Sequence, residues 1–314
     1  MSEIISVMMW PAIACLLLPG ILVYLGLHIV RREVIFVDLA LAQVATLGTC
    51  LALLLGHEAH DIQTYFWSFG FTLVGAALFA LTRAKNHQQV PQEALIGIVY
   101  VVAAALGILL LSRSAEGNEE LRRTLIGDVL LVTPQEVMKT FSIYLGIGAV
   151  HFIFRKKFLM ISFEPERALS EKLAVRWWDF LFYALFGLVV TSFVQIGGVL
   201  LVFSYLIVPA VCANFLARKL SALLAIGWTT ATVSSVIGLY TAYRFDFPTG
   251  AAIVCVLGAA LVLVAIAAWV FKEREASGWK RNTFSTKPEL GAGSNAHTRT
   301  NIASTHDHAP NSRQ

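Results

Sequence analysis

Apolar stretches long enough to cross a membrane follow one another along almost the whole chain. A helix of about 20 residues spans the ~30 Å hydrocarbon core of a bilayer. Hydrophobic residues make up 57% of the 314 positions and charged residues 14%, whereas soluble domains have about 25% charged residues. The sequence therefore predicts an all-α, polytopic transmembrane helical bundle of about 8–9 spans, at residues 7–27, 36–56, 62–82, 94–112, 134–154, 180–196, 199–217, 220–243 and 248–271.

Basic residues gather after every second predicted span, and the loops between these positions hold few of them. Cytoplasmic loops of membrane proteins carry an excess of Lys and Arg. We therefore expect the N-terminus outside and the C-terminus in the cytoplasm. The net charge of +4 is explained by this topology, and no nucleic-acid partner is expected. The basic residues that carry the pattern include Arg31, Arg32, Arg83, Lys85, Arg155, Lys156, Lys157, Arg218 and Lys219.

Two short segments predict where helices break or begin. Gln195-Ile-Gly-Gly198 is a very short connection, so the two spans beside it form either a tight helical hairpin or a broken, re-entrant pair. Thr133-Pro-Gln-Glu136 has the spacing of a capping box, with proline at the first helical position. We therefore expect the fifth span to begin at Pro134.

The composition changes near Ser277 from apolar residues to Ser, Thr, Asn, Gly, Pro and His. Segments with few large apolar residues bury too little surface to offset the entropy of folding. The sequence therefore predicts one transmembrane permease domain at 1–272 and a disordered cytoplasmic tail at 273–314.

Polar side chains within or beside the second predicted span are the candidates for contact with an ion. Asp38 and Gln43 are five residues apart, about 140° around a helix, so they line one path only if other helices close around them. At the far end, His57, His60 and Asp61 supply imidazole and carboxylate groups, which suit zinc, manganese or ferrous ions. Two alternatives remain open: Asp38 reaches the membrane interface as a helix-end acid, and the second group contacts solvent or a partner.

No motif for nucleotide binding or covalent catalysis occurs in the sequence. It contains no GxxxxGK[ST] loop, no HExxH and no GxSxG, so the chain does not cradle nucleotide phosphates itself. We predict a transport subunit and not an enzyme. The basic and then amphipathic segment 155–178 is either an interfacial helix held by anionic membrane lipid or a docking element for a cytoplasmic partner.

Five stretches, in order and at compatible spacing over about residues 10–270, resemble the ABC-3 family of bacterial permeases. Segment 36–49 is similar to the family pattern GDALSHAxLPG, and 127–138 to GxxLLVxxED. Segment 161–176 is similar to SFDPELAxAxGV, 194–214 to VGVLLVxALLVIPAAxA, and 246–259 to DLPxGAxIVLxxG. The sequence itself reads FVDLALAQVATLGT, GDVLLVTPQEVM, ISFEPERALSEKLAVR, VQIGGVLLVFSYLIVPAVCAN and DFPTGAAIVCVLGA at these places.

The resemblance implies a homodimeric pore in the bacterial cytoplasmic (inner) membrane. Such permeases work with cytoplasmic ABC ATPase subunits and an extracytoplasmic metal-binding protein. They import zinc, manganese or ferrous iron as a transported ion, with no permanently bound cofactor. The resemblance also assigns ATPase docking to the segment 163–167, which consists of Phe163, Glu164, Pro165, Glu166 and Arg167.

The sequence departs from the family pattern at the acid–histidine pair of the second span. Gln43 occupies the histidine position, and Asp38 lies one residue out of register with the family acid. Either Asp38 acts with groups from other spans, or the group from His57 to Asp61 takes part of the role. The alternatives are a secondary metal-ion transporter driven by an ion gradient and an ABC permease for a metal chelate.

Overall fold

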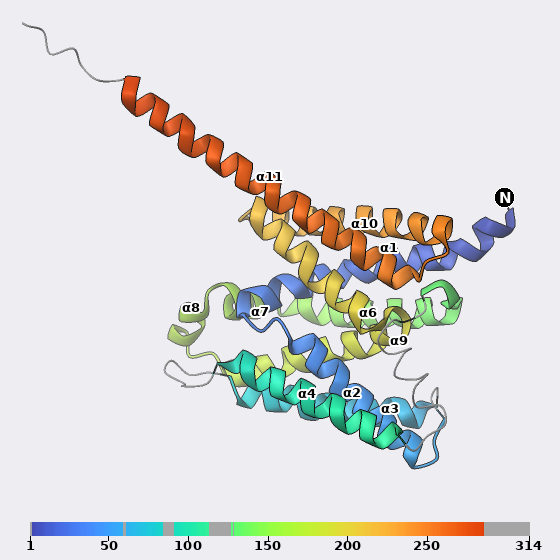
Figure 1. Ribbon diagram of the computed structural model, residues 1–314. Helices are drawn as coiled ribbons and strands as arrows, with labels where there is room; N and C mark the ends of the chain where they lie inside the picture. The colour runs from blue at the N-terminus through green and yellow to red at the C-terminus, as the bar shows by residue number, and fades with distance from the viewer. Residues whose placement is uncertain (1, 59–60, 84–90, 113–126, 128, 286–314) are drawn as a thin grey trace, which may run out of the picture. The chain divides into compact units, whose positions relative to one another are not determined.

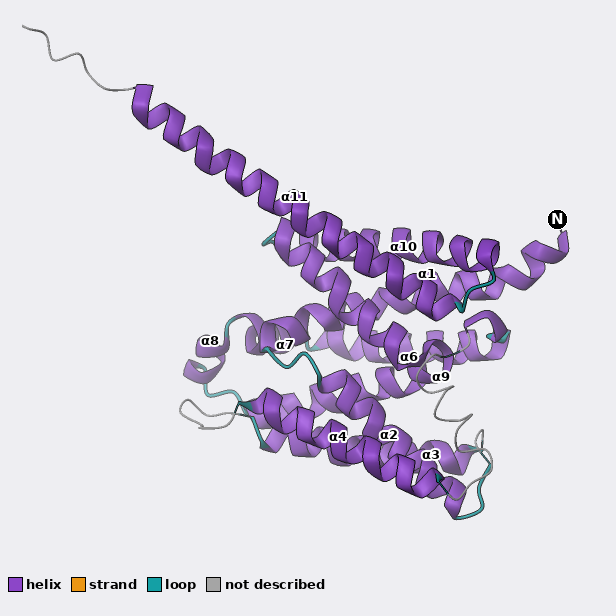
Figure 2. Ribbon diagram, viewed as in Figure 1, coloured by secondary structure: helices purple, strands orange, loops and turns teal. Residues whose placement is uncertain are grey.

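A computed structural model describes residues 2–58, 61–83, 91–112, 127 and 129–285. Within these residues every regular element is a helix and no strand occurs, as Figure 2 shows. The prediction of an all-α polytopic bundle is therefore confirmed. The helices are α1 Ser2–Arg32, α2 Val37–Leu54, α3 Ile62–Leu81, α4 Gln92–Leu111, η1 Val129–Leu131, α6 Pro134–Ile153, α7 Arg155–Phe163, α8 Pro165–Ser170, α9 Val175–Leu216, α10 Leu220–Phe245 and α11 Thr249–Ser285.

Seven of the described helices are long and apolar enough to cross a membrane, or eight if the bent pair α6–α7 forms one span. The axes of α6 and α7 differ by 76°. The two spans predicted at 180–196 and 199–217 both fall on the 42-residue α9, in which two helices meet at a break. The count of seven or eight treats them as one span, so it agrees with the prediction of about 8–9.

A break at Gly198 divides α9 into two arms, 175–197 and 199–216. Gly198 has φ 70° and ψ 163°, a conformation that is essentially restricted to glycine because a Cβ atom would clash with the backbone. Figure 1 shows the ribbon of α9 turning back at this point. The break lies within the segment 195–198 where the sequence predicted one.

The long helix α9 forms the centre of the described bundle. It packs against α1, α2, α3 and α10, and 78% of its most apolar window is buried. Large aromatic side chains fill the space between these helices, and five of the largest fully buried ones lie on α9. Burial of such side chains excludes water from the protein interior. They are Phe182, Tyr183, Phe186, Phe193 and Tyr205.

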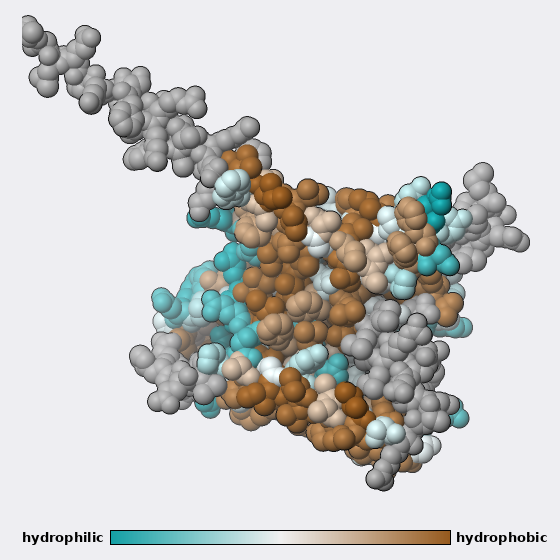
Figure 3. All heavy atoms as spheres, viewed as in Figure 1, coloured by the Kyte–Doolittle hydropathy of each residue, from teal (hydrophilic) through white to brown (hydrophobic). Residues whose placement is uncertain are grey.

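Helices at the edge of this bundle expose apolar side chains instead. Only 22% of the most apolar window of α4 and 17% of that of α11 are buried. Figure 3 shows apolar side chains across α4 and across the region of α10 and α11, and hydrophilic side chains at the end where α7 and α8 lie. Exposed apolar surface on helices of this length is typical of contact with lipid.

The start of α6 and the extent of α11 bear on two further predictions. Thr133 Oγ1 accepts from Glu136 N, and Glu136 Oε2 accepts from Thr133 N at 2.7 Å, so the predicted capping box is confirmed. The predicted boundary between 272 and 273 lies within α11, which continues to Ser285. Residues 286–314 lie outside the described residues, and the division into domain and tail stays a prediction.

Candidate functional site

Asp38 lies in the first turn of α2 and is buried within the protein. Asp38 is 2% exposed and Gln43 is 8% exposed. Asp38 therefore does not reach toward water as an acid at the membrane interface would. Asp38 Oδ1 has no hydrogen-bond partner, and no described basic side chain forms an ion pair with it. A buried carboxylate oxygen without a hydrogen-bond partner is costly, so Asp38 is a candidate for contact with a cation.

A second carboxylate, which the sequence interpretation did not single out, lies near the start of α2. Glu93, in the first turn of α4, accepts a hydrogen bond from Phe36 N through its Oε1 atom at 3.0 Å. Its Oε2 atom is buried without a partner, and the Asp38 and Glu93 carboxylates interact electrostatically. The only sequence signal was its position directly before the predicted span 94–112.

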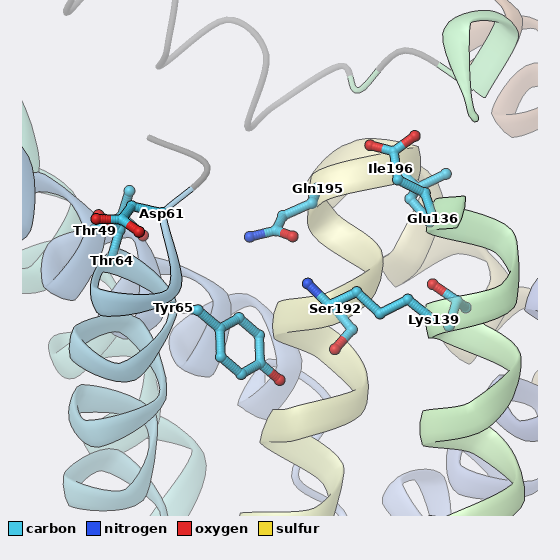
Figure 4. A pocket seen from close by; sticks show the side chains of 10 residues that line it. Thr49, Asp61, Thr64, Tyr65, Glu136, Lys139, Ser192, Gln195 and Ile196 are labelled. Carbon is cyan, nitrogen blue, oxygen red and sulfur yellow. The ribbon is translucent and has the colours of Figure 1, made fainter. Parts of the chain in front are cut away.

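The three residues predicted as a group at the far end of α2, His57, His60 and Asp61, do not form one site among the described residues. Asp61 caps α3 by accepting from Ile62 N at 2.7 Å, and its side chain lines a polar cleft of about 140 Å³. His57 does not line this cleft, and His60 lies outside the described residues. Figure 4 shows the cleft between α3, α6 and the end of the first arm of α9. The residues lining it are Thr49, Asp61, Thr64, Tyr65, Glu136, Lys139, Thr140, Ser192, Gln195 and Ile196.

The charged groups of the polar cleft already have roles in the fold. Asp61 and Glu136 each cap the start of a helix, and the ammonium group of Lys139 lies 4.8 Å from the centre of the Tyr65 ring. A cavity of this volume holds several water molecules, since one water needs only about 10–15 Å³ measured in this way. The described residues contain no group of three or more His, Cys, Asp or Glu side chains placed to hold a metal ion. The cleft is therefore a polar space with room for water, and its described residues do not form a metal centre.

The predicted docking segment 163–167 joins α7 to α8 and lies at the surface. Pro165 begins α8. Arg167 donates to Glu164 and to Glu171, each at 3.0 Å. These hydrogen bonds raise the pKa of the Arg167 guanidinium group, and the bond to Glu164 has the larger effect. These side chains are 45–60% exposed, so the network is a surface feature available to a partner or to lipid headgroups.

A buried cluster of charged residues next to this segment was missed by the sequence interpretation. Arg32, at the end of α1, pairs with Asp179 of α9, and Asp179 also pairs with Arg83. Ser162, one residue before the docking segment, is bonded to Arg32. Arg32 and Arg83 had been used only as indicators of topology, and their contacts place the ends of α1, α3 and α7 at one end of the bundle.

Comparisons with known proteins agree on one family. Residues 4–268 match the ABC 3 transport family. The manganese transport system membrane protein MntC of Listeria innocua is 35% identical over 199 residues, which are 62% of this chain and 70% of the relative. A membrane protein of Haemophilus influenzae, named for an iron transport system, is 30% identical over 183 residues, 58% of this chain and 67% of the relative. The structure of PsaBC from Streptococcus pneumoniae in complex with Fab has a similar fold, with a TM-score of 0.69, 24% identity, and coverage of 82% of this chain and 90% of that one.

Proposed function

The chain belongs to the ABC 3 transport family, and from this premise we propose that it is the permease subunit of an ATP-binding cassette importer for a divalent transition metal ion. The observation that carries the proposal is the family match over 4–268, which runs from α1 into α11. The protein is a multi-pass membrane protein with at least seven apolar helices of sufficient length, and its place is the bacterial cytoplasmic membrane.

Manganese is the first cargo we propose, followed by ferrous iron. Two relatives carry names that refer to manganese and to iron transport. The buried carboxylate of Asp38 and the half-buried carboxylate of Glu93 support the same choice, because carboxylate oxygens suit manganese, whereas imidazole and thiolate suit zinc. A metal ion does not cross hydrocarbon bare, so a pathway needs a few polar groups that bind it weakly enough to release it. Contacts of Gln43, His57 and Asp61 with the ion stay predictions, as does that of His60.

The energy source we propose is a separate ATPase chain. The sequence has no phosphate-binding loop, so ATP hydrolysis falls to a partner that docks at segment 163–167. Two copies of the permease form the pore, and an extracytoplasmic metal-binding protein delivers the ion. The permease itself holds no permanent cofactor and carries out no covalent step.

The test is manganese uptake by cells that lack their own manganese importers and express the complete transporter with the Asp38→Asn variant. The substitution keeps the size of the side chain and removes its charge, so we expect at least tenfold less uptake at an unchanged permease level in the membrane. Asp246→Asn is the matched control. Asp246 is an exposed residue at the end of α10 with φ 56° and ψ 40°, and asparagine tolerates this left-handed conformation. Full uptake by Asp38→Asn would remove Asp38 from the pathway.

A further inference from the structure

The end of α1 contributes to a buried polar joint that the proposed pathway does not use. We define the joint as His28, Arg32, Arg83, Ser162 and Asp179. The Arg32 side chain is 3% exposed and that of Asp179 is fully buried. Arg32 Nη1 donates to Asp179 Oδ1 at 2.8 Å, and Arg83 forms the second ion pair with the same carboxylate. The carboxylate of Asp179 on α9 therefore forms ion pairs with two arginine side chains from other parts of the chain.

The same guanidinium group also holds the helix that leads to the docking segment. Arg32 Nε donates to Ser162 Oγ at 2.8 Å, and His28 Nδ1 lies 2.8 Å from that oxygen. Ser162 is in the last turn of α7, and the next residue, Phe163, begins the docking segment and lies against Arg31. Arg32 thus connects α7 to α9 directly, through two hydrogen bonds from one rigid, planar group.

The composition of the joint does not fit a role in stability alone. An apolar cluster of similar volume is often as stable as a buried ion pair or more so, because both charges lose their hydration. Two guanidinium groups share one carboxylate here, and His28 Nε2 is buried without a hydrogen-bond partner. The Arg32 guanidinium group also lies over the Phe182 ring, 3.9 Å from its centre. A buried polar group that lacks a hydrogen-bond partner needs an explanation. One explanation is that the hydrogen bonds and ion pairs of the joint differ between two conformations of the protein.

The first arm of α9 carries any displacement of Asp179 to the polar cleft. Asp179 is near the start of this arm, and Ser192 and Gln195 near its end line the cleft. At 1.5 Å per residue, the 16 residues from Asp179 to Gln195 cover about 24 Å of helix. No non-helical residue interrupts the arm before Gly198, so its two ends move together.

We propose that the buried polar joint transmits movement of the docking segment to α9 and thereby opens and closes the polar cleft. The proposal rests on the proposed function for the ATPase that moves the docking segment. Arg32, Ser162 and Asp179 are positioning residues in this scheme and do not contact the ion. Nucleotide binding by the ATPase displaces α7, the Arg32 guanidinium group follows Ser162, and Asp179 follows Arg32.

The test measures the response of the cleft to ATP in the purified complex of permease and ATPase in nanodiscs. A single reactive cysteine is introduced as Gln195→Cys, with the exposed Cys255 changed to serine; the other three native cysteines are buried. The rate of maleimide labelling is compared between nucleotide-free and vanadate-trapped complexes. We expect at least a fivefold difference with the native joint, and less than twofold with Ser162→Ala or Asp179→Asn, at unchanged ATPase co-purification.

Two further variants separate transmission from folding. Ser170→Ala is the matched control, because Ser170 Oγ bonds only to the Arg167 carbonyl of its own helix; it should keep the full response. The triple variant Arg32→Met, Arg83→Met and Asp179→Leu replaces both ion pairs by apolar groups and should fold without restoring the response. A native response in Ser162→Ala and Asp179→Asn, or in the triple variant, would overturn the proposal. An ATP response without manganese uptake would refute the proposed cargo and leave the joint supported.

Discussion

A close approach of the backbones of α1 and α9 gives a sharp prediction for Gly26 of α1. A Cβ atom built on Gly26 would lie 1.9 Å from the carbonyl oxygen of Leu206 on α9. Contacts of this kind essentially never fall below 3.0 Å, so the Gly26→Ala variant fits only if α1 and α9 separate by about 1.1 Å. The obstacle is backbone on both sides, and rotation of a side chain does not relieve it.

The expected cost follows from this separation. Overpacking of a close contact costs about 1–3 kcal/mol, and the upper value applies here because two long helices must move. Alanine regains about 1 kcal/mol over glycine in a helix, which leaves a net destabilisation of about 2 kcal/mol. At roughly 2–4 °C per kcal/mol for a domain of this size, the midpoint of thermal unfolding should fall by about 4–8 °C.

The assay is the fraction of purified permease that remains monodisperse in detergent after heating, measured by size-exclusion chromatography. Gly20→Ala is the matched control on the same helix, because a Cβ atom there meets nothing within 4 Å. Its midpoint should stay equal or rise. A Gly26→Ala midpoint at or above that of Gly20→Ala would refute the α1–α9 packing described here.

Two further predictions use the docking segment and the break in α9. Reversing the charges of Glu164 and Glu166 to lysine should release the ATPase in a pull-down from membranes, whereas undiminished association would favour contact of this segment with lipid headgroups. Gly198→Ala should lower the thermal midpoint, since its φ of 70° and ψ of 163° cost another residue about 1–3 kcal/mol. Gly197→Ala is the control, because its Cβ atom would meet only the flexible Leu201 side chain at 3.2 Å; equal midpoints for both variants would contradict the assigned break.

Features set by neighbouring residues were predictable from the sequence. The capping box at Thr133 and Glu136 needs only the spacing of two residues, and the break at Gly198 follows from two glycines in a short polar connection. The apolar stretches located the helices because the length of a span is fixed by the bilayer. Their number depends on α9, because two helices that meet at the break at Gly198 are counted there as one long helix.

The polar joint was not predictable in the same way, because its members are far apart in the sequence. Arg32 and Ser162 are 130 residues apart, and Arg32 and Asp179 are 147 apart. Each one alone has an ordinary explanation as a helix-end or loop residue. The position of Glu93 near Asp38 was not predictable for the same reason, because the two residues lie 55 positions apart on different helices.

The distribution of burial explains how such polar groups persist in so apolar a chain. The most apolar windows of α2 and α9 are 67% and 78% buried, whereas that of α4 is 22% buried. An ionisable group facing hydrocarbon costs roughly 2.5–3.5 kcal/mol on insertion scales. Asp38 on α2 and Asp179 on α9 avoid this contact because both face protein. We therefore expect a path for a metal ion to pass the polar groups of α2 or α9, which the protein already shelters.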